Sequence, residues 1–134
     1  EGYWCSIADE CSGANQATAA LDAYVDAAKF AMLAPLPPAA LSAAGRLKYM
    51  LVHKDGTLRG VNGAVVDEIK ALESYRGHEL FIHPGDAVIA TQNCFSWGGV
   101  VKLNHASDDQ VLRDYAYLEA VCLETDGGLW DIVP

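Results

Sequence analysis

The spacing of apolar and polar positions changes along the chain and predicts a helical N-terminal third followed by a strand-rich region. After possible helix caps at Ser12, Gly13 and Asn15, apolar residues recur every three or four positions, as on one face of a helix. The helix is expected to end before Pro35, because a residue that precedes proline is disfavoured in helical conformation. The expected apolar face holds Leu21, Tyr24, Val25, Ala28 and Met32, with Asp22, Asp26 and Lys29 on the other face.

The segment after this helix contains a proline-rich stretch at 34–38, which we interpret as a rigid connector rather than a polyproline ligand. A short helix is expected over 39–44, with Gly45 as its C-cap. Residues 47–61 alternate between two faces around Asp55-Gly56, which predicts a β-hairpin. A second helix is expected over 65–72.

The C-terminal half is expected to be mostly extended. Asp86 either caps a short helix that reaches Asn93 or begins a strand, because a short apolar run does not separate the two periods. Further strands are expected at 99–103, along the alternating run 111–123, and at 129–133 after a turn at 125–128.

This order of elements predicts an α+β fold. A central antiparallel sheet would carry the N-terminal amphipathic helix and the short helices packed on one side. The length of 134 residues suits a single domain spanning 1–134, in which 1–14 form a cysteine-bearing arm.

The net charge of the chain limits the classes of partner that it is expected to bind. The net charge is −9, and the acidic residues are spread along the chain, which disfavours binding to nucleic acid or to anionic membrane surfaces. No apolar run approaches the roughly 18 residues of a membrane-spanning helix, so no membrane insertion is expected.

The four cysteines allow three disulfide pairings. The preferred pairing joins Cys5 to Cys11 and Cys94 to Cys122, which implies a periplasmic or extracellular protein. The start at Glu1 fits removal of a signal peptide and fits a shortened chain equally well. A zinc site is the competing interpretation, but C-x-x-C is absent and the four histidines lack ligand spacing, so no metal is expected.

Known catalytic motifs, including G-x-S-x-G, H-E-x-x-H and a Gly-rich phosphate loop, do not occur in the sequence. We therefore expect a binding protein rather than an enzyme, with no cofactor and with a small molecule or another protein as its partner. Trp97 beside two glycines is either a pocket wall or a core anchor. His83 before Pro84 is either an anion donor or a surface histidine.

Arg113, Tyr115 and Tyr117 would share one strand face if 111–123 is a strand. That face would suit a carboxylate, because arginine presents paired donors. The alternative is a cross-strand ladder in which Glu119 is the partner.

Several segments resemble the Cache domains, extracellular sensors of PAS-like shape. The resemblance rests on LKYMLVHKDGTL at 47–58, on the helix-forming segment 65–72, on WGGVVKL at 97–103 and on RDYAYL at 113–118. It implies a pocket on one sheet face for a small organic acid, amine or amino acid. The contacts would come from Tyr49, Trp97, Arg113 and Tyr117.

Two other hypotheses stay open at this point. The C-terminal DGGLWDI at 126–132 also looks like the final hairpin of the nuclear-transport-factor-like cone fold, which would make the chain an enzyme or a binder. Alternatively, exposed apolar groups such as Tyr3, Trp4 or the proline segment would let a disulfide-locked subunit assemble with copies of itself.

Overall fold

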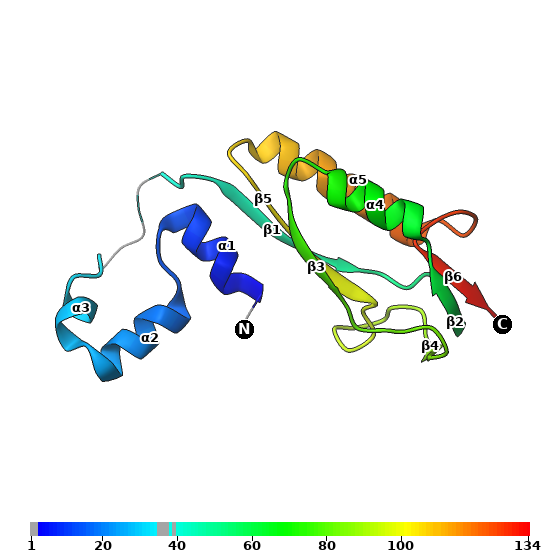
Figure 1. Cartoon of the computed structure of the whole chain (residues 1–134), viewed down its shortest axis with the longest axis horizontal. Helices are drawn as coiled ribbons and strands as arrows, with labels where there is room; N and C mark the ends of the chain where they lie inside the picture. Colours follow the sequence, from blue (N-terminus) through cyan, green and yellow to red (C-terminus); the bar gives the residue numbers. More distant parts are fainter. Residues whose placement is uncertain (1–2, 35–37, 39) are drawn as a thin grey trace.

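Two small antiparallel sheets carry the fold in the computed structural model, which describes residues 3–34, 38 and 40–134 (Figure 1). One sheet has the strand order β1-β5-β3 and the other β4-β2-β6. The elements are α1 (Tyr3–Ser12), α2 (Gln16–Val25), α3 (Ala27–Ala31), β1 (Ala44–Met50), β2 (Gly56–Val61), α4 (Gly63–Ala71), β3 (Tyr75–Leu80), β4 (Ala87–Val88), β5 (Gly99–His105), α5 (Asp108–Leu123) and β6 (Trp130–Val133).

The expected hairpin over 47–61 is wrong in its pairing, although both of its strands form. β1 pairs with β5, and β2 pairs with β4 and β6. The linker between β1 and β2 is held by other partners, since the Leu51 carbonyl accepts from Trp130 Nε1 and the Val52 N–H donates to Thr91 Oγ1. The Asp55-Gly56 turn therefore leads from one sheet to the other.

The alternating run 111–123 is a helix, so the expected strand there is wrong. Ser107 caps α5 by accepting from the Gln110 N–H. Two aspartates occupy the first turn, where their negative charges interact favourably with the helix dipole. Its buried positions repeat every three or four residues, which is the helical period. They are Val111, Asp114, Leu118 and Cys122.

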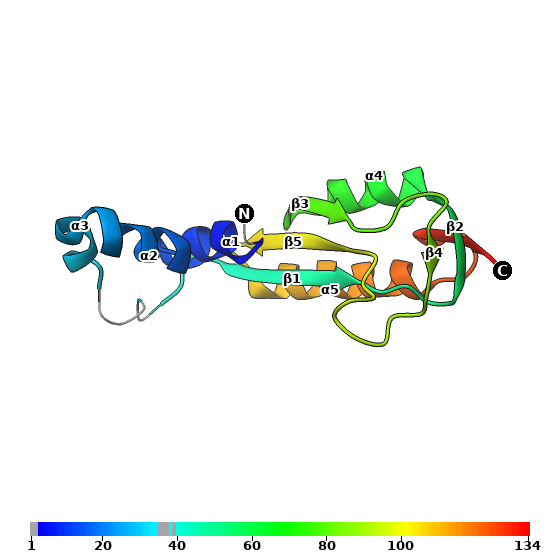
Figure 2. The same cartoon turned by 90° about the horizontal axis from the view of Figure 1, so that it is seen from below.

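Helices α4 and α5 lie over one face of the first sheet (Figures 1 and 2). The main core lies between them and this sheet and extends to residues of the second sheet, including Leu58 and Ile132. The helix α4 confirms the one expected over 65–72, and it buries Val65 and Ile69. Val101 and Leu103 of β5 enter the same core and are fully buried.

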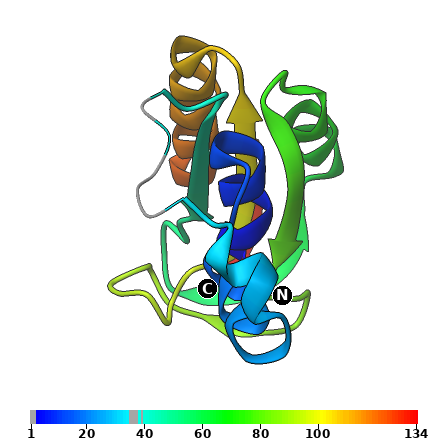
Figure 3. The same ribbon diagram turned by 90° about the vertical axis from the view of Figure 1, so that its left-hand side faces the viewer.

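Helix α1 covers the opposite face of the first sheet, and in the view along the long axis it stands in front of the strands (Figure 3). The predicted arm 1–14 is thus mostly a helix. Ile7 and Cys11 of α1 pack on Leu47 and Val100 in a second buried cluster. Successive residues of a strand point to opposite faces, which is why β5 can serve both clusters.

Helices α2 and α3 replace the single helix expected before Pro35 and project away from the sheets (Figures 1 and 2). Asp26 ends α2 and caps α3 by accepting from the Lys29 N–H. The expected orientation is wrong. Asp22 is buried, whereas the apolar side chains of Leu21, Tyr24, Val25 and Met32 are exposed.

The segment before β1 is not helical in its described part, so the expected helix over 39–44 is wrong. Ser42 Oγ donates to the backbone carbonyls of Glu10 and Cys11, which ties this segment to α1 and leads directly into the strand. Positions 35–37 and 39 lie outside the described residues.

Between α4 and β5 the chain adds the unexpected strand β3, with a bulge between Tyr75 and Gly77. The ambiguous segment after Asp86 forms the short strand β4. The α+β class and its antiparallel pairing are confirmed. The sheet is divided in two, and helices cover both faces of β1-β5-β3.

Candidate functional site

Two of the predicted ligand-binding residues meet in the structure. The rings of Tyr49 and Trp97 stack with their centroids 3.6 Å apart and their planes at 20°. Tyr49 comes from β1 and Trp97 from the loop before β5. The next residue, Gly98, lies against the ring of Trp130, where a β-carbon would stand 2.5 Å from Cζ2. Both aromatic residues are half-buried, so the pair both anchors the loop and forms a surface platform.

The other predicted ligand-binding residues are not assembled with this platform. His83 lies in the turn before β4 and faces Asp86 across 3.8 Å. Arg113 is on α5, where its guanidinium donates to Gln110 of the same helix. Tyr117 is also on α5 and bonds to α4. The common strand face that would have joined Arg113 to Tyr117 does not exist, because the segment is helical.

Tyr117 instead fastens α5 to α4 by donating its hydroxyl to Glu68 Oε2. Burial, followed by the hydrogen bond and the charge of Glu68, raises the pKa of Tyr117 to about 12. A phenol whose proton is held in this way stays neutral at physiological pH. It joins two helices rather than binding an anion.

A buried carboxylate joins α5 to the start of β3. Asp114 accepts from the Ser74 N–H at 3.0 Å, from Ser74 Oγ at 2.6 Å and from Gln110 Nε2 at 2.8 Å. These three hydrogen bonds replace those that the carboxylate would otherwise make to water. Asp114 and Ser74 therefore serve to hold α5 against the start of β3.

Lys48 is a buried cation on the face of β1 that α5 covers. Its ammonium lies 3.6 Å from Glu119 and 4.5 Å from the ring centroid of Tyr115. Both partners come from α5, so the lysine links that helix to the sheet.

The imidazole of His53 differs from these groups. Both of its ring nitrogens are buried and have no hydrogen-bond partner among the described residues. His53 follows Val52, whose N–H and carbonyl both bond to Thr91.

All four cysteines are free thiols, so the predicted pairs Cys5–Cys11 and Cys94–Cys122 are wrong. Cys5 and Cys11 lie on one helix, six positions apart. They are thus separated by about 9 Å along the axis, beyond the reach of a disulfide. Cys94 is in an exposed loop while Cys122 is inside the main core. The expectation of a periplasmic or extracellular location loses its structural basis and stays a prediction.

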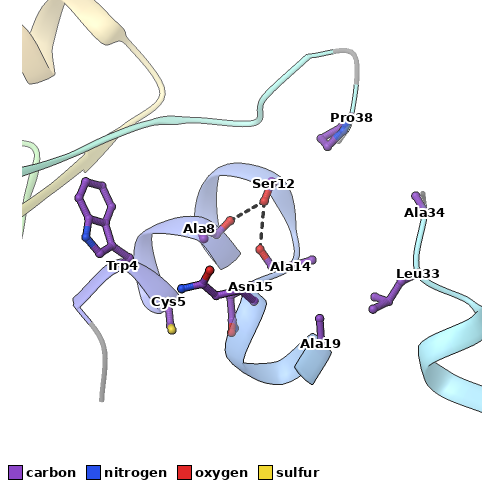
Figure 4. Close-up of a pocket in the computed structure, with 11 residues that line it drawn as sticks. Trp4, Cys5, Ala8, Ser12, Ala14, Asn15, Ala19, Leu33, Ala34 and Pro38 are labelled. Carbon is purple, nitrogen blue, oxygen red and sulfur yellow. Dashed lines mark hydrogen bonds between the residues drawn. The ribbon is translucent and has the colours of Figure 1, made fainter. Parts of the chain in front are cut away.

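An apolar groove of about 530 Å³ lies between α1, α2 and the segment after α3 (Figure 4). Small side chains line its middle, including Ala8, Ala14 and Ala19, and larger ones line its edges, including Trp4 and Leu33. Asn15 caps α2 at the groove by accepting from the Thr18 N–H, while its amide donates to Asp9.

Sequence reasoning missed this groove. The period of 21–32 predicts an apolar stripe, and period does not tell which side of a helix is covered. The sequence does point to Trp4 and the proline segment as exposed apolar groups, and Trp4 and Pro38 line the groove. The side chain of Tyr3 lies outside what the structure describes.

Two negative observations apply to the described part of the chain. No group of three or more His, Cys, Asp or Glu side chains there is arranged to hold a metal ion. No described helix is both long enough and apolar enough to cross a membrane.

Comparison with known proteins finds a solved structure of similar fold. The chain matches no protein-family model and no curated protein sequence. Among solved structures, it is similar to an L-amino acid ligase from Bacillus licheniformis, with a TM-score of 0.67 and 16% sequence identity. The match covers 98% of this chain and 29% of the ligase chain, so the chain spans less than a third of the protein that it resembles.

This likeness corrects the expected function. The fold shared with the ligase points away from a free-standing Cache-like sensor of small organic acids, amines or amino acids. The geometry agrees, because the four residues of the expected pocket do not converge. Arg113 and Tyr117 contact other residues of the helical layer, away from the Tyr49–Trp97 platform.

Proposed function

We propose that this chain is a structural part of an enzyme that joins L-amino acids through an amide bond. The observation that carries the proposal is the extent of the structural match. It covers 98% of the chain, and therefore includes the projecting helices as well as the two sheets. A coincidental likeness of one common motif would be confined to the sheet or to a helix pair.

The role within such an enzyme is to hold and position rather than to react. Most buried polar side chains are bound to partners inside the chain, as Lys48 is to Glu119 and Asp114 is to Ser74. Reactive groups need free donors or acceptors directed at a substrate. His53 is the exception among them, with two buried nitrogens that no described residue binds.

The proposal is tested by a coupling assay on the complete gene product. Pairs of the common L-amino acids are incubated with ATP and Mg²⁺, and amide products are identified by mass spectrometry. A dipeptide that requires both amino acids and ATP is the expected result, and reactions lacking one component are the controls. The absence of any amide product from every pair, in a protein shown to be folded, contradicts the proposal.

A further inference from the structure

Residues 16–34, here called the helical arm, present their apolar side chains outward. Tyr24 is 91% exposed and Met32 is 85% exposed, values close to those of an unfolded chain. Leu21, Val25 and Phe30 are also exposed. A single exposed apolar residue is ordinary, but five within one short arm form a patch of the kind found at protein interfaces.

The inward side of the arm is polar. Asp22 is the buried residue of α2, and its carboxylate bonds to Lys29 at 3.1 Å, which joins α2 to α3. No described apolar residue of the arm is buried. Helices of 10 and 5 residues are marginal in water without packing, so the arm needs a surface outside itself to be stable.

The groove beside the arm continues this apolar surface. Its lining passes from Leu33 at the end of the arm across Ala19 of α2 to Trp4 of α1 (Figure 4). Alanines in the middle leave room for bulky side chains, and the larger residues at the edges would enclose them. The shape therefore suits a protein segment that carries large apolar residues, as in helix-in-groove recognition.

A second copy of the chain is disfavoured as the occupant. Each copy carries a net charge of −9, and bringing two such copies together is opposed by electrostatic repulsion. The occupant is better matched by a surface that is apolar at its centre and neutral or basic at its rim.

The structural match indicates where this surface belongs. The ligase fold includes a counterpart of the arm, because the match covers 98% of this chain, yet more than two-thirds of the ligase lies outside the match. We infer that the helical arm and its groove dock on the remaining body of a ligase-like polypeptide, through Tyr24, Val25, Met32 and the groove edges. This inference rests on the proposed function and adds the interface by which the chain is held in the enzyme.

The two methionines of the chain allow a direct test. Met32 lies at the end of α3 and is exposed, whereas Met50 is 1% exposed in the main core. Oxidation by hydrogen peroxide follows exposure of the thioether. Peptide mass spectrometry compares the oxidation rates of both residues in the native protein and in the urea-unfolded protein. Docking predicts that Met32 reacts about tenfold more slowly in the native protein than in the unfolded one, as Met50 in the core does.

Paired variants locate the interface. Tyr24→Ser with Val25→Ser removes apolar contacts from the arm and should restore fast oxidation of Met32 in the complete protein. Phe95→Ser is the matched control, since Phe95 is 95% exposed but lies in the loop before β5. Fast oxidation of Met32 in the unaltered complete protein overturns the inference. Protection of Met32 that grows with protein concentration also overturns it, because the occupant would then be a second copy.

The coupling assay separates this inference from the proposed function. Protection of Met32 in a protein that forms no amide product leaves the docking surface intact and removes the ligase role. Amide formation in a protein whose Met32 is oxidised rapidly supports the ligase role and removes the docking surface. Amide formation and Met32 oxidation depend on different residues and different reagents. Failure of the proposed function can therefore be told apart from failure of the docking inference.

Discussion

Gly45 of β1 lies directly under Ile7 of α1, close enough that a β-carbon on Gly45 would overlap Ile7 Cγ2 and stand 2.9 Å from Cys11 Sγ. This contact is where the N-terminal helix meets the sheet. The absence of a side chain at one strand position therefore sets how closely α1 can pack, and with it the position of the groove and the arm.

Replacing this glycine should loosen α1 without unfolding the sheets. Gly45→Ala forces the helix outward, and overpacking of this kind costs about 1–3 kcal/mol. Thermal or urea unfolding measures the loss, and faster labelling of Cys11 in native buffer shows that it is local to α1. Gly63→Ala is the control, because a β-carbon there meets nothing within 4 Å. Equal stability of Gly45→Ala and Gly63→Ala would show that α1 does not depend on this contact.

The carboxylate of Asp114 provides a second test of the fold. Asp114→Ala leaves the N–H and hydroxyl of Ser74, which is fully buried, without their acceptor. Unsatisfied buried donors of this kind should lower the free energy of unfolding by about 3 kcal/mol. The exposed Asp109→Ala, in the first turn of the same helix, should cost under about 1 kcal/mol in urea unfolding. A similar loss in both variants would mean that Asp114 acts only through the helix dipole.

The sequence predicts correctly those elements whose pattern of residues lies within the element itself. The strands β1, β2, β5 and β6 and the helix α4 follow from alternation, turn residues and period. The predicted hairpin is wrong because β1 pairs with partners 49 to 61 residues further along the chain, and nothing near Asp55-Gly56 specifies them. Tyr49 and Trp97 lie together because of that same long-range pairing, and their role in ligand binding stays a prediction.

The errors in the helices have a different cause. In 111–123 the aromatic and β-branched residues favoured a strand, and the Ser107 cap with its acidic first turn was the stronger signal. In the helical arm the predicted helical period is correct, but the predicted buried face is not, because the buried side of α2 holds Asp22. An apolar stripe identifies residues whose burial would be favourable. It does not tell whether the same chain or another surface covers them.

The phenol of Tyr117 predicts a change at high pH. Its folded pKa is raised to about 12 from 10.0, by burial first and then by Glu68. Because the folded value lies above the unfolded one, the contribution to stability is complete below pH 10 and is lost as the pH rises through about 12. Absorbance titration of tyrosinate should lose its highest step in Tyr117→Phe. Glu68→Gln should lower that step, since it keeps a hydrogen-bond acceptor and removes the charge. An unchanged titration in Tyr117→Phe contradicts the assignment.

The free thiols predict an order of alkylation. Cys94 is exposed and should react first, because the thiolate is the attacking species and access is open. Burial raises the pKa of the Cys11 thiol, with a further rise from Glu10, and burial raises that of Cys122 to about 11. Both should stay unlabelled by iodoacetamide at pH 8 until the protein is unfolded, as peptide mass spectrometry can show.

Cys94→Ser is the control for this order, and it should remove the fastest labelled site without changing the others. Labelling of Cys122 at the rate of Cys94 in native buffer would contradict its place in the core. A native Cys5–Cys11 disulfide would require α1 to unwind, because a continuous helix keeps residues six positions apart beyond bonding distance. That bond would therefore release Ile7 and Cys11 from Leu47 and Val100, and the helical arm would lose its attachment to the sheet.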